Sequence, residues 1–472
     1  MRLRTTLLMV LVLLGLGAYV YWVELPKSRE EAKKKTILEL KTDDVTQVSL
    51  VYADREIVVK RADGKWRMIK PVDAPADDTA VNNLISALAE AELKKTFDDA
   101  SDLAQYGLDQ PFVKITATTG DRDLPTILVG RSAPVGYSAY VKKADEAKVL
   151  VTTAAFRSGM DKQPKDLRDK TIVTFADSDV QQLELRGSGK DIALVQQADS
   201  WTIERPAAHA ADAATMRSYL SSLRSLRAAD FASDRPADLS AYGLDSPRLK
   251  ISLYLGKEKA EKHLLIGKEN ENKQVYLQDS GQPTVYLVSD WAVRDLDKNI
   301  KDFRNKTVLA FEPDKINSVE FTRKDGAHFK LVRGDARQWR VEGAGEIKPA
   351  QTAITQYLND LRSLVGYDIA ADEPRDLAAW GLAQPLLRLT LTGEANKPVG
   401  TVLLGAPDPS RKEYSAMAEG GHTVFLIRDY LFSRLDKQAA DFVDKPTPTA
   451  GAEQPIPELG DEFGEEEPFA EE

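Results

Sequence analysis

The side chains of this 472-residue chain that could do chemistry are four histidines and many carboxylates, because cysteine is absent. Without cysteine there is no disulfide framework, thiolate metal site or thiol nucleophile. The histidines show no metal-ligand spacing and occupy unrelated positions: His209, His263, His328 and His422. No H-E-x-x-H, G-x-S-x-G, Walker-type or strand-following G-x-G-x-x-G motif occurs in the body of the chain. We therefore predict no catalytic, cofactor-binding or metal-binding residues, and a protein that is not an enzyme.

Two carboxylate pairs and one glycine-rich stretch have both a chemical and a structural interpretation. Asp77-Asp78 and Asp98-Asp99 could serve acid–base or calcium chemistry. Asp77 corresponds to Asp212, but Ala350 stands there in a third copy, and the place just before a predicted helix favours N-capping. The stretch 187–189, Gly-Ser-Gly, joins two strand patterns and favours a hairpin turn over a phosphate-binding nest.

The elements that must position these residues occur three times. Each copy opens with a threonine before an apolar run, at spacings of 135 and 136 residues: Thr36, Thr171 and Thr307. A tryptophan follows in each copy, at Trp66, Trp201 and Trp339. Each copy closes with a similar charged segment, at 166–170, 302–306 and 441–445. Such self-similarity predicts three tandem modules, at 36–170, 171–306 and 307–445.

The most specific landmark is D-L-x-x-[YW]-G-L-x-x-P, at 102–111, 238–247 and 376–385. Its recurring aromatic residue and glycine could mark a ligand site. The favoured interpretation is structural: Asp caps a short helical turn, Gly takes a left-handed conformation, Leu packs back and Pro ends the turn. The recurring tryptophans lie in alternating strand patterns, which favours a core position. An apolar residue and a glycine recur downstream at 129–130, 266–267 and 404–405.

Within the first copy, the patterns predict strands at 45–52, 56–61, 65–70, 113–119, 125–129, 138–141 and 149–152. One amphipathic helix lies between the two sets of strands. Its apolar stripe recurs in every copy: Val81, Leu84, Ile85, Leu88 and Ala91; Met216, Tyr219, Leu220, Leu223 and Leu226; Ile354, Tyr357, Leu358, Leu361 and Leu364. The predicted fold class is α+β: three tandem copies of a mostly antiparallel sheet module with one main helix each, behind an N-terminal transmembrane helix.

Residues 1–35 are interpreted as a short basic N-terminus, a membrane anchor and a charged stalk. The run 5–23 contains no charge and ends in aromatic residues, which is typical of a spanning helix. The alternative is a cleaved signal peptide, with Gly15 and Gly17 near the cut. Five cations in 27–35 outnumber Arg2 and Arg4, which favours the opposite topology by charge count. We still expect a body outside the cytoplasm, because a short basic N-terminus also begins a translocated signal-anchor.

The charge of the chain is unevenly distributed. The net charge is −10, and residues 446–472 hold nine acids and no Lys or Arg, so the remainder is near −1. A nearly neutral body disfavours general nucleic-acid binding. The tail is rich in Pro and Glu and is predicted to be disordered. An alternative is that Phe463 and Phe469, set among acids, dock on a basic partner.

With these landmarks, the chain resembles a bacterial membrane-anchored family catalogued as a domain of unknown function, often encoded beside ABC transporter genes of the gliding-motility type. The resemblance covers 36–445 and rests on Trp66, Trp201 and the first two D-L-x-x-Y-G-L-x-x-P elements. The third copy departs from it, since it has Trp380 for tyrosine and no proline matching Pro71 and Pro206. The resemblance implies a periplasmic body, tethered by a single pass to the inner membrane, and brings no catalytic residues.

Three functions follow as hypotheses. The first is a non-enzymatic envelope protein that serves as an accessory or scaffold of an ABC-type transport complex and contacts its permease or auxiliary subunits. The second is an extracytoplasmic carbohydrate- or peptide-binding module with exposed aromatic platforms; burial of Trp66, Trp201 and Trp339 would exclude those residues. The third, an envelope hydrolase, is the least favoured and would need converging carboxylates in a cleft.

Overall fold

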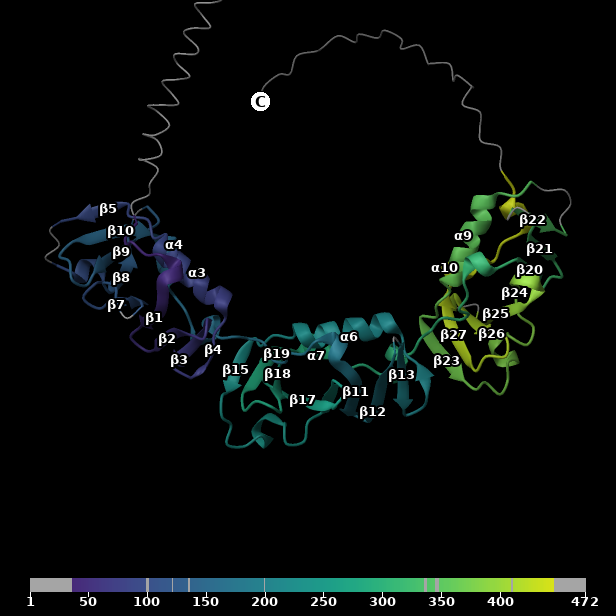
Figure 1. Cartoon of the computed structure of the whole chain (residues 1–472), viewed down its shortest axis with the longest axis horizontal. Helices are drawn as coiled ribbons and strands as arrows, with labels where there is room; N and C mark the ends of the chain where they lie inside the picture. The colour runs from purple at the N-terminus through teal and green to yellow at the C-terminus, as the bar shows by residue number, and fades with distance from the viewer. Residues whose placement is uncertain are drawn as a thin grey trace, which may run out of the picture. The chain divides into compact units, whose positions relative to one another are not determined.

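The structure is a computed structural model that describes residues 36–444, except 99–101, 121, 135, 199, 335–337, 344–347 and 409–410. It contains three antiparallel sheets, one for each copy (Figure 1). The predicted tandem sheet modules are therefore confirmed. Within the described residues, no helix has the length and apolar character needed to cross a membrane. The predicted span at 5–23 and the acidic tail at 446–472 lie outside these residues.

The chain divides into two compact units. One comprises the described residues up to Ala208 together with Ala214–Asn299, which brings the first two modules together. The other comprises His209–Ala213 with the described residues from Ile300 onward and holds the third module. The short segment 209–213 thus groups with the third module although its neighbours in sequence belong to the second.

In module 1 the two predicted sets of strands form one continuous sheet. Its order is β4-β3-β2-β1-β6-β8-β9-β10-β5, and β7 pairs with β6. The bounds are β1 Val45–Val51, β2 Glu56–Ala62, β3 Lys65–Lys70, β4 Ala74–Pro75, β5 Lys95–Phe97, β6 Val113–Thr119, β7 Arg122–Asp123, β8 Ile127–Ser132, β9 Ser138–Lys143 and β10 Val149–Thr153. The predicted strands are recovered, and the short strands β4, β5 and β7 are additions. Because β1 pairs with β6 antiparallel, the two sets share one core.

Modules 2 and 3 repeat this plan. The second sheet has the order β14-β13-β12-β11-β16-β17-β18-β19-β15, and the third β22-β21-β20-β24-β25-β26-β27-β23. Their bounds are β11 Val180–Gly187, β12 Lys190–Gln197, β13 Ser200–Arg205, β14 His209–Ala210, β15 Asp230–Ser233, β16 Leu249–Leu255, β17 Ala260–Glu269, β18 Gln274–Asp279, β19 Val285–Ser289, β20 Ser318–Arg323, β21 His328–Arg333, β22 Trp339–Glu342, β23 Asp368–Asp372, β24 Leu387–Thr392, β25 Pro398–Asp408, β26 Glu413–Ala418 and β27 Thr423–Arg428.

The main helix of each module crosses one face of its sheet: α3 Asp78–Ala89, α6 Ala213–Ser225 and α9 Gln351–Arg362. All members of the predicted stripes are buried. In module 1 the stripe of α3 and the inward-facing strand residues form one core. Figure 1 shows α6 along one face of the second sheet. Burying a Leu or Ile side chain contributes about 1.5–3 kcal/mol, so burial of the stripe stabilises each module.

Short helices complete each module and were missed by the periodicity. One follows the last long strand: α4 Ala154–Gly159, α7 Asp290–Arg294 and α10 Asp429–Leu435. Another overlaps the start of the closing charged segment: α5 Pro164–Leu167, α8 Ile300–Phe303 and the 3₁₀ turn η11 Ala439–Phe442. Helices of one or two turns are too short to show an apolar period, which explains the omission.

The second face of each sheet is covered only in part. In module 3 a smaller core of Leu382, Leu403, Met417 and Val424 lies there, with Trp380 packed against it. These contacts come from the W-G-L turn, which covers the half of the sheet that holds β25, β26 and β27. The other half, around the first strand of each module (β1, β11 and β20), carries polar side chains. A ligand site on this face of the sheet would lie on that half.

Candidate functional site

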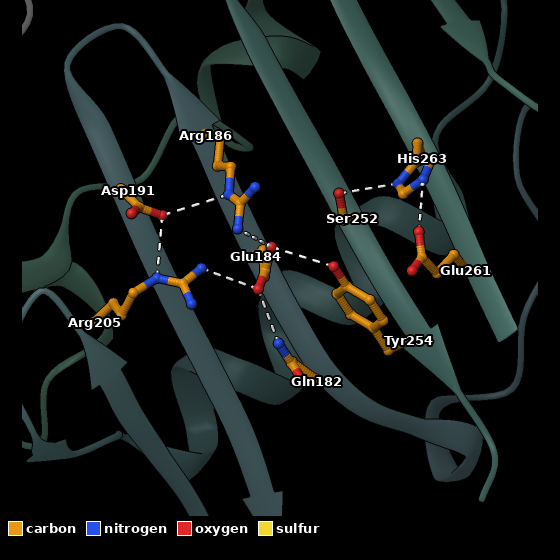
Figure 2. Close-up of polar contacts among 9 residues, drawn as sticks. All are labelled: Gln182, Glu184, Arg186, Asp191, Arg205, Ser252, Tyr254, Glu261 and His263. Carbon is orange, nitrogen blue, oxygen red and sulfur yellow. Dashed lines mark hydrogen bonds and ion pairs between the residues drawn. The ribbon is translucent and has the colours of Figure 1, made fainter. Parts of the chain in front are cut away.

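A cluster of polar side chains lies on this open half-face in module 2 (Figure 2). Alternation along β11 directs Leu183 and Leu185 into the core and Glu184 to the opposite face. Arg205 reaches the same face from β13, and Tyr254 from β16. The cluster therefore follows from strand periodicity together with the pairing of β11 with β12 and β16.

Glu184 is a buried carboxylate held by several donors. Its side chain is 5% exposed and accepts hydrogen bonds from Arg205 Nη2 at 2.9 Å and Gln182 Nε2 at 2.9 Å. Arg186 Nη2 lies 3.0 Å away, and the Tyr254 hydroxyl donates at 3.3 Å. The hydrogen bond to Glu184 holds the pKa of Arg205 above its ordinary value. Both carboxylate oxygens are thus engaged by donors, and the group is suited to holding the strands together rather than to accepting a substrate proton.

A Ser–His–Glu array lies on the neighbouring strands (Figure 2). His263 Nδ1 is 3.0 Å from Ser252 Oγ, and its Nε2 is 3.1 Å from Glu261 Oε2. These residue types match a hydrolytic triad, but Ser252 lies in the middle of β16 and is only 4% exposed. A nucleophile must reach a substrate carbonyl, and this one is covered.

The same position in the other modules explains the array. Thr116 and Thr126 bond across the strands at 2.9 Å in module 1, and Thr401 donates to Thr390 at 3.3 Å in module 3. These pairs occupy the register positions of Ser252 and His263. The array is therefore a cross-strand link in which histidine replaces threonine.

The remaining histidines lie apart from this cluster. His328 Nε2 is 2.8 Å from Glu320, and His422 Nδ1 is 3.3 Å from Glu373. Burial and the nearby Arg304 lower the pKa of His209. In the described part of the chain, no three His, Asp or Glu side chains come together as metal ligands would.

The D-L-x-x-[YW]-G-L-x-x-P element is a folding turn, as predicted. The Asp102, Asp238 and Asp376 side chains accept hydrogen bonds from the backbone N–H two residues on, at 2.8–3.0 Å. The glycine φ angles of +65° to +66° lie in the left-handed region at Gly107, Gly243 and Gly381. The following leucines, Leu108, Leu244 and Leu382, are each 2% exposed.

This turn also explains the second recurring glycine. A Cβ at Gly130 would meet the Tyr106 carbonyl oxygen at 2.3 Å, and one at Gly267 would meet the Tyr242 carbonyl oxygen at 2.2 Å. The turn therefore rests directly on the strand that follows it. The turn and the second recurring glycine, which are about twenty residues apart in sequence, therefore form one close contact.

The other landmarks also have structural roles in the fold. Trp66, Trp201 and Trp339 are 2%, 8% and 4% exposed, so they cannot be binding platforms. Asp77 caps α3 by accepting from the Ala80 N–H at 2.9 Å, as predicted. The stretch 187–189 is a hairpin turn, since Gly187 pairs with Lys190.

The closing charged segment of a module binds the module that follows. Arg168 Nη1 and Nη2 donate to Asp234 at 3.2 and 2.6 Å, and its guanidinium carbon lies 3.6 Å from the Phe231 ring centroid. Arg304 donates to Asp372 in the same way, at 2.6 and 2.7 Å. Both arginines are more than nine-tenths buried. We call the segments 164–170 and 300–306 the junction segments.

A lysine in each junction segment adds a second contact. Lys165 Nζ lies 2.7 Å from Asp230, and Lys301 Nζ donates to the Ile369 carbonyl at 2.8 Å. Sequence reasoning used these segments only as repeat markers. A signal was present, because the lysine and the arginine recur in the first two copies, whereas Ala440 and Val443 stand at these positions in the third copy.

A cleft of about 680 Å³ adjoins the first junction segment and is lined by Pro71, Asp73, Arg168 and Tyr286, among others. Among the described residues, Arg168 Nε has no hydrogen-bond partner. Arg61 Nε is in the same state, and Arg61 lies over the Trp66 ring. An unpartnered Nε thus also occurs at a ring-stacked arginine that does not line this cleft, so by itself it does not indicate a ligand.

The fold and junctions define a class: a tandem-repeat protein of α+β sheet modules in which each junction segment binds the next module. The chain belongs to the family described as domain of unknown function (DUF4340), whose model matches residues 66–236, 201–374 and 339–447. Each of the first two matches begins at a module's tryptophan and ends just beyond Asp234 or Asp372 of the next module. The family unit therefore includes a junction.

Comparison with curated proteins finds no match. Among solved structures, the chain is similar to the sliding clamp (DNA polymerase III subunit beta) from Pseudomonas aeruginosa bound to griselimycin, with 8% identity, 84% of this chain and 94% of that chain covered, and a TM-score of 0.14. A second structure of the same Pseudomonas aeruginosa subunit shares 9% identity, covers 84% and 93%, and has a TM-score of 0.13. Scores this low carry no argument about function.

Proposed function

We propose that this protein is a non-enzymatic, membrane-anchored envelope protein that serves as a scaffold or accessory of an ABC-type transport complex. The observation that supports the proposal is that the recurring residues have structural roles. The tryptophans, the Y-G-L turns, the paired glycines and the junction arginines all make contacts within or between modules. Repetition in this chain maintains an architecture, and a repeated architecture is suited to presenting surfaces to partners.

Two features of the sequence support the location. The uncharged run at 5–23 has the length of a spanning helix. The resemblance to an anchored envelope family favours a single inner-membrane pass with a periplasmic body and transporter subunits as partners.

The location is tested by cysteine labelling. An introduced cysteine is the single site of labelling, because the chain has no cysteine of its own. Tyr137 is 93% exposed, so Tyr137→Cys offers a reporter on module 1. A membrane-impermeant maleimide should label it in intact spheroplasts, and cysteine placed at Arg2 should label only after lysis. Protection of position 137 until lysis would contradict the periplasmic body.

The partner is tested by photo-crosslinking in native membranes, followed by mass spectrometry. Probes belong at exposed positions of separate modules, such as Tyr137, Trp291 and Tyr430. We expect permease or auxiliary subunits of a transporter among the products. A probe at the buried Trp66 serves as the matched control, because it should give only crosslinks within the chain. If no exposed probe recovers a transport subunit, the scaffold proposal is wrong.

One observation favours the alternative of a carbohydrate- or peptide-binding module. Trp291 and Tyr430 are 68% and 58% exposed and occupy the same position, the second residue of α7 and of α10. Exposed aromatic rings at a repeated position suit stacking on a sugar or packing on a peptide. Arrays of envelope glycans and peptides test this role: binding should be lost in Trp291→Ala and retained in Tyr137→Ala. Equal binding by both variants would remove Trp291 from such a site.

A further inference from the structure

The last long hairpin of each module ends in a corner of fixed geometry. The first residue of β9, β18 or β26 pairs with the last residue of β10, β19 or β27, and a short helix begins immediately after that pair. The residue just before the hairpin is left-handed in every module, with φ angles of +46° at Tyr137, +57° at Lys273 and +52° at Lys412. We define the corner as this turn residue together with the second residue of the short helix.

Each corner carries one exposed aromatic ring. Tyr137, Trp291 and Tyr430 are 93%, 68% and 58% exposed, and they are the three most exposed large apolar side chains of the described residues. Modules 2 and 3 carry the ring on the helix, whereas module 1 has Ala155 there and carries the ring on the turn. The backbone joins the two sides, since the Ala154 N–H donates to the Tyr137 carbonyl at 2.9 Å. The ring is therefore present at every corner, although different residues supply it.

This exposure leaves the rings without a role in folding. A side chain that stays in water makes little difference to stability, so packing within the module does not explain why a ring recurs at the same place. The backbone that carries it is fixed by the left-handed turn and the start of the helix. Tyr and Trp have one apolar and one polar part, which suits them to boundaries between the protein and another phase or molecule. The recurring ring therefore indicates a contact outside the chain.

The surroundings of the ring favour a lipid surface over a protein partner. Trp291 is the sole large apolar side chain that is exposed in the described part of module 2. A ring that anchors a protein–protein contact normally lies within a larger apolar patch, and Trp291 has none around it. A lone ring of this kind suits the headgroup region of a bilayer, where Trp and Tyr are enriched. All three corner rings are Trp or Tyr, and none is Phe.

A lysine forms the turn side of the corner in modules 2 and 3. Lys273 and Lys412 are exposed, and within the described part of the chain neither enters an ion pair. By contrast, Arg294, one turn after Trp291, is neutralised by Asp290 at 3.0 Å. An unpaired lysine at the same corner as an interfacial ring is complementary to the phosphate of a lipid headgroup. Module 1 carries its ring at the place of the lysine, so its corner offers the ring alone.

We propose that the corner of each module is a lipid-contact site. The aromatic ring enters the headgroup region of a phospholipid bilayer, and the lysine of modules 2 and 3 binds the headgroup phosphates. Each corner acts by itself. The contact goes beyond the proposed function, because it needs no transporter subunit. It also gives Tyr137 the same role as Trp291, which the carbohydrate- or peptide-binding alternative does not.

The test places a fluorophore at either end of one hairpin of module 2, in the full chain reconstituted into phospholipid vesicles. A cysteine at Asn272 lies next to the corner residue Lys273, and a cysteine at Ser280 lies beyond the opposite end of β18 as the matched control. Both positions are exposed, and the chain has no other cysteine. A lipid with a nitroxide in its headgroup region quenches only fluorophores close to it. We expect quenching at position 272 and little at position 280.

Variants of the corner separate the ring from the lysine. Trp291→Ala should lower the ratio of lipid-bound to free corners about five- to tenfold, because half-burial of a ring contributes about half the effect of full burial. Lys273→Gln should lower it about fivefold in phosphatidylglycerol vesicles and have little effect in phosphatidylcholine vesicles, which carry no net charge. The matched charge control is Lys257→Gln, in the turn between β16 and β17 at the other end of the sheet, which should change neither.

Vesicle flotation reports separately whether the chain is bound to the membrane. A chain that floats but shows equal quenching at positions 272 and 280, or quenching that Trp291→Ala leaves unchanged, would overturn the lipid contact and leave the proposed function intact. A chain that does not float would contradict both. Crosslinking of position 291 to a protein subunit in native membranes, together with no quenching in vesicles, would assign the corner to a protein partner and overturn the lipid contact.

Discussion

Replacing Thr152 by valine should stabilise module 1. Thr152 is the second-last residue of β10 and is fully buried, and its hydroxyl finds no hydrogen-bond partner among the described residues. The equivalent residues, second-last in β19 and β27, are Val288 and Ile427, and both are also fully buried. The position therefore accepts an apolar side chain in this fold.

The magnitude follows from the cost of burying an unpaired hydroxyl. That cost is about 1–3 kcal/mol, and valine keeps the shape of threonine while removing it. We expect a gain of about 1–2 kcal/mol in the free energy of unfolding of module 1. Because each 1.4 kcal/mol is a factor of ten, the slowest amides of β9 and β10 should exchange roughly 5- to 30-fold more slowly.

The assay is hydrogen exchange read by mass spectrometry on the full chain, so that peptides of module 1 are followed apart from the other modules. The matched control is Thr116→Val, because the Thr116 hydroxyl bonds to Thr126 at 2.9 Å. That variant should lose about 0.5–1.5 kcal/mol. Faster exchange of β9 and β10 in Thr152→Val would refute the reasoning, because it would mean that the hydroxyl is bonded.

Three further perturbations address the turn, a junction and a buried hydroxyl. Gly130→Ala should destabilise module 1 by about 1–3 kcal/mol in thermal unfolding, since its Cβ would meet the Tyr106 carbonyl oxygen at 2.3 Å. Tyr219→Phe should cost module 2 about 1–2 kcal/mol in denaturant unfolding, because its buried hydroxyl donates to a backbone carbonyl at 2.9 Å. Hydrogen bonds from Arg304 lower the pKa of Asp372, so this pair stabilises the fold above the ordinary aspartate pKa of about 3.9 and the effect is lost as pH falls through the lowered value. Arg304→Gln should therefore reduce the acid-induced drop in the melting temperature of module 3.

Each of these has an outcome that would contradict it. Gly159→Ala is the control for the turn, because a Cβ there meets nothing within 4 Å, and equal losses in the two alanine variants would argue against the close contact. Unchanged stability of Tyr219→Phe would mean that water replaces the hydroxyl. A melting profile in acid that is identical in the Arg304→Gln and parent chains would mean that Asp372 titrates as it does in the unfolded chain.

Much of the module could be predicted from sequence because its signals are local. The apolar stripe at Val81, Leu84, Ile85 and Leu88 is a helical period, and a period survives without knowledge of the partner sheet. The turn at Gly107 was predictable for the same reason, since its aspartate, glycine and proline act on their own neighbours. Edge strands and helices of one or two turns were not, because they are stabilised by pairing and packing at long range.

The polar clusters were decided by tertiary structure. Sequence spacing could not show that Ser252 and His263 face each other across two strands, nor that threonine pairs take their place elsewhere. The junction residues were visible as a motif, but their partners Asp234 and Asp372 lie 66 and 68 residues away. Only the fold brings such distant charges together.

The sequence alone does not predict which residue places a tyrosine hydroxyl against a buried carbonyl. In modules 2 and 3 the helix residues Tyr219 and Tyr357 donate to a carbonyl at or just beyond the C-terminal end of the short helix, at 2.9 and 3.1 Å. In module 1 the helix carries Leu84 at that position, and Tyr52, just beyond β1, donates to the equivalent Met160 carbonyl at 2.5 Å. The need for a donor is set by a buried carbonyl, which is a property of the packed module.

The acidic residue beside that carbonyl behaves in the same way. Asp161 pairs with Arg55 at 2.9 Å, Asp297 with Lys190, and Asp436 with Arg323. Arg55 and Lys190 hold equivalent positions in their modules. Arg323 occupies a different position in module 3, yet it pairs with the equivalent carboxylate. The sequence by itself determined the repeat, the module class and the local turns, because these depend on period and neighbours. Which residue supplies each buried donor or cation was decided by tertiary structure, since a charge or carbonyl can be satisfied from any position that the fold brings within reach.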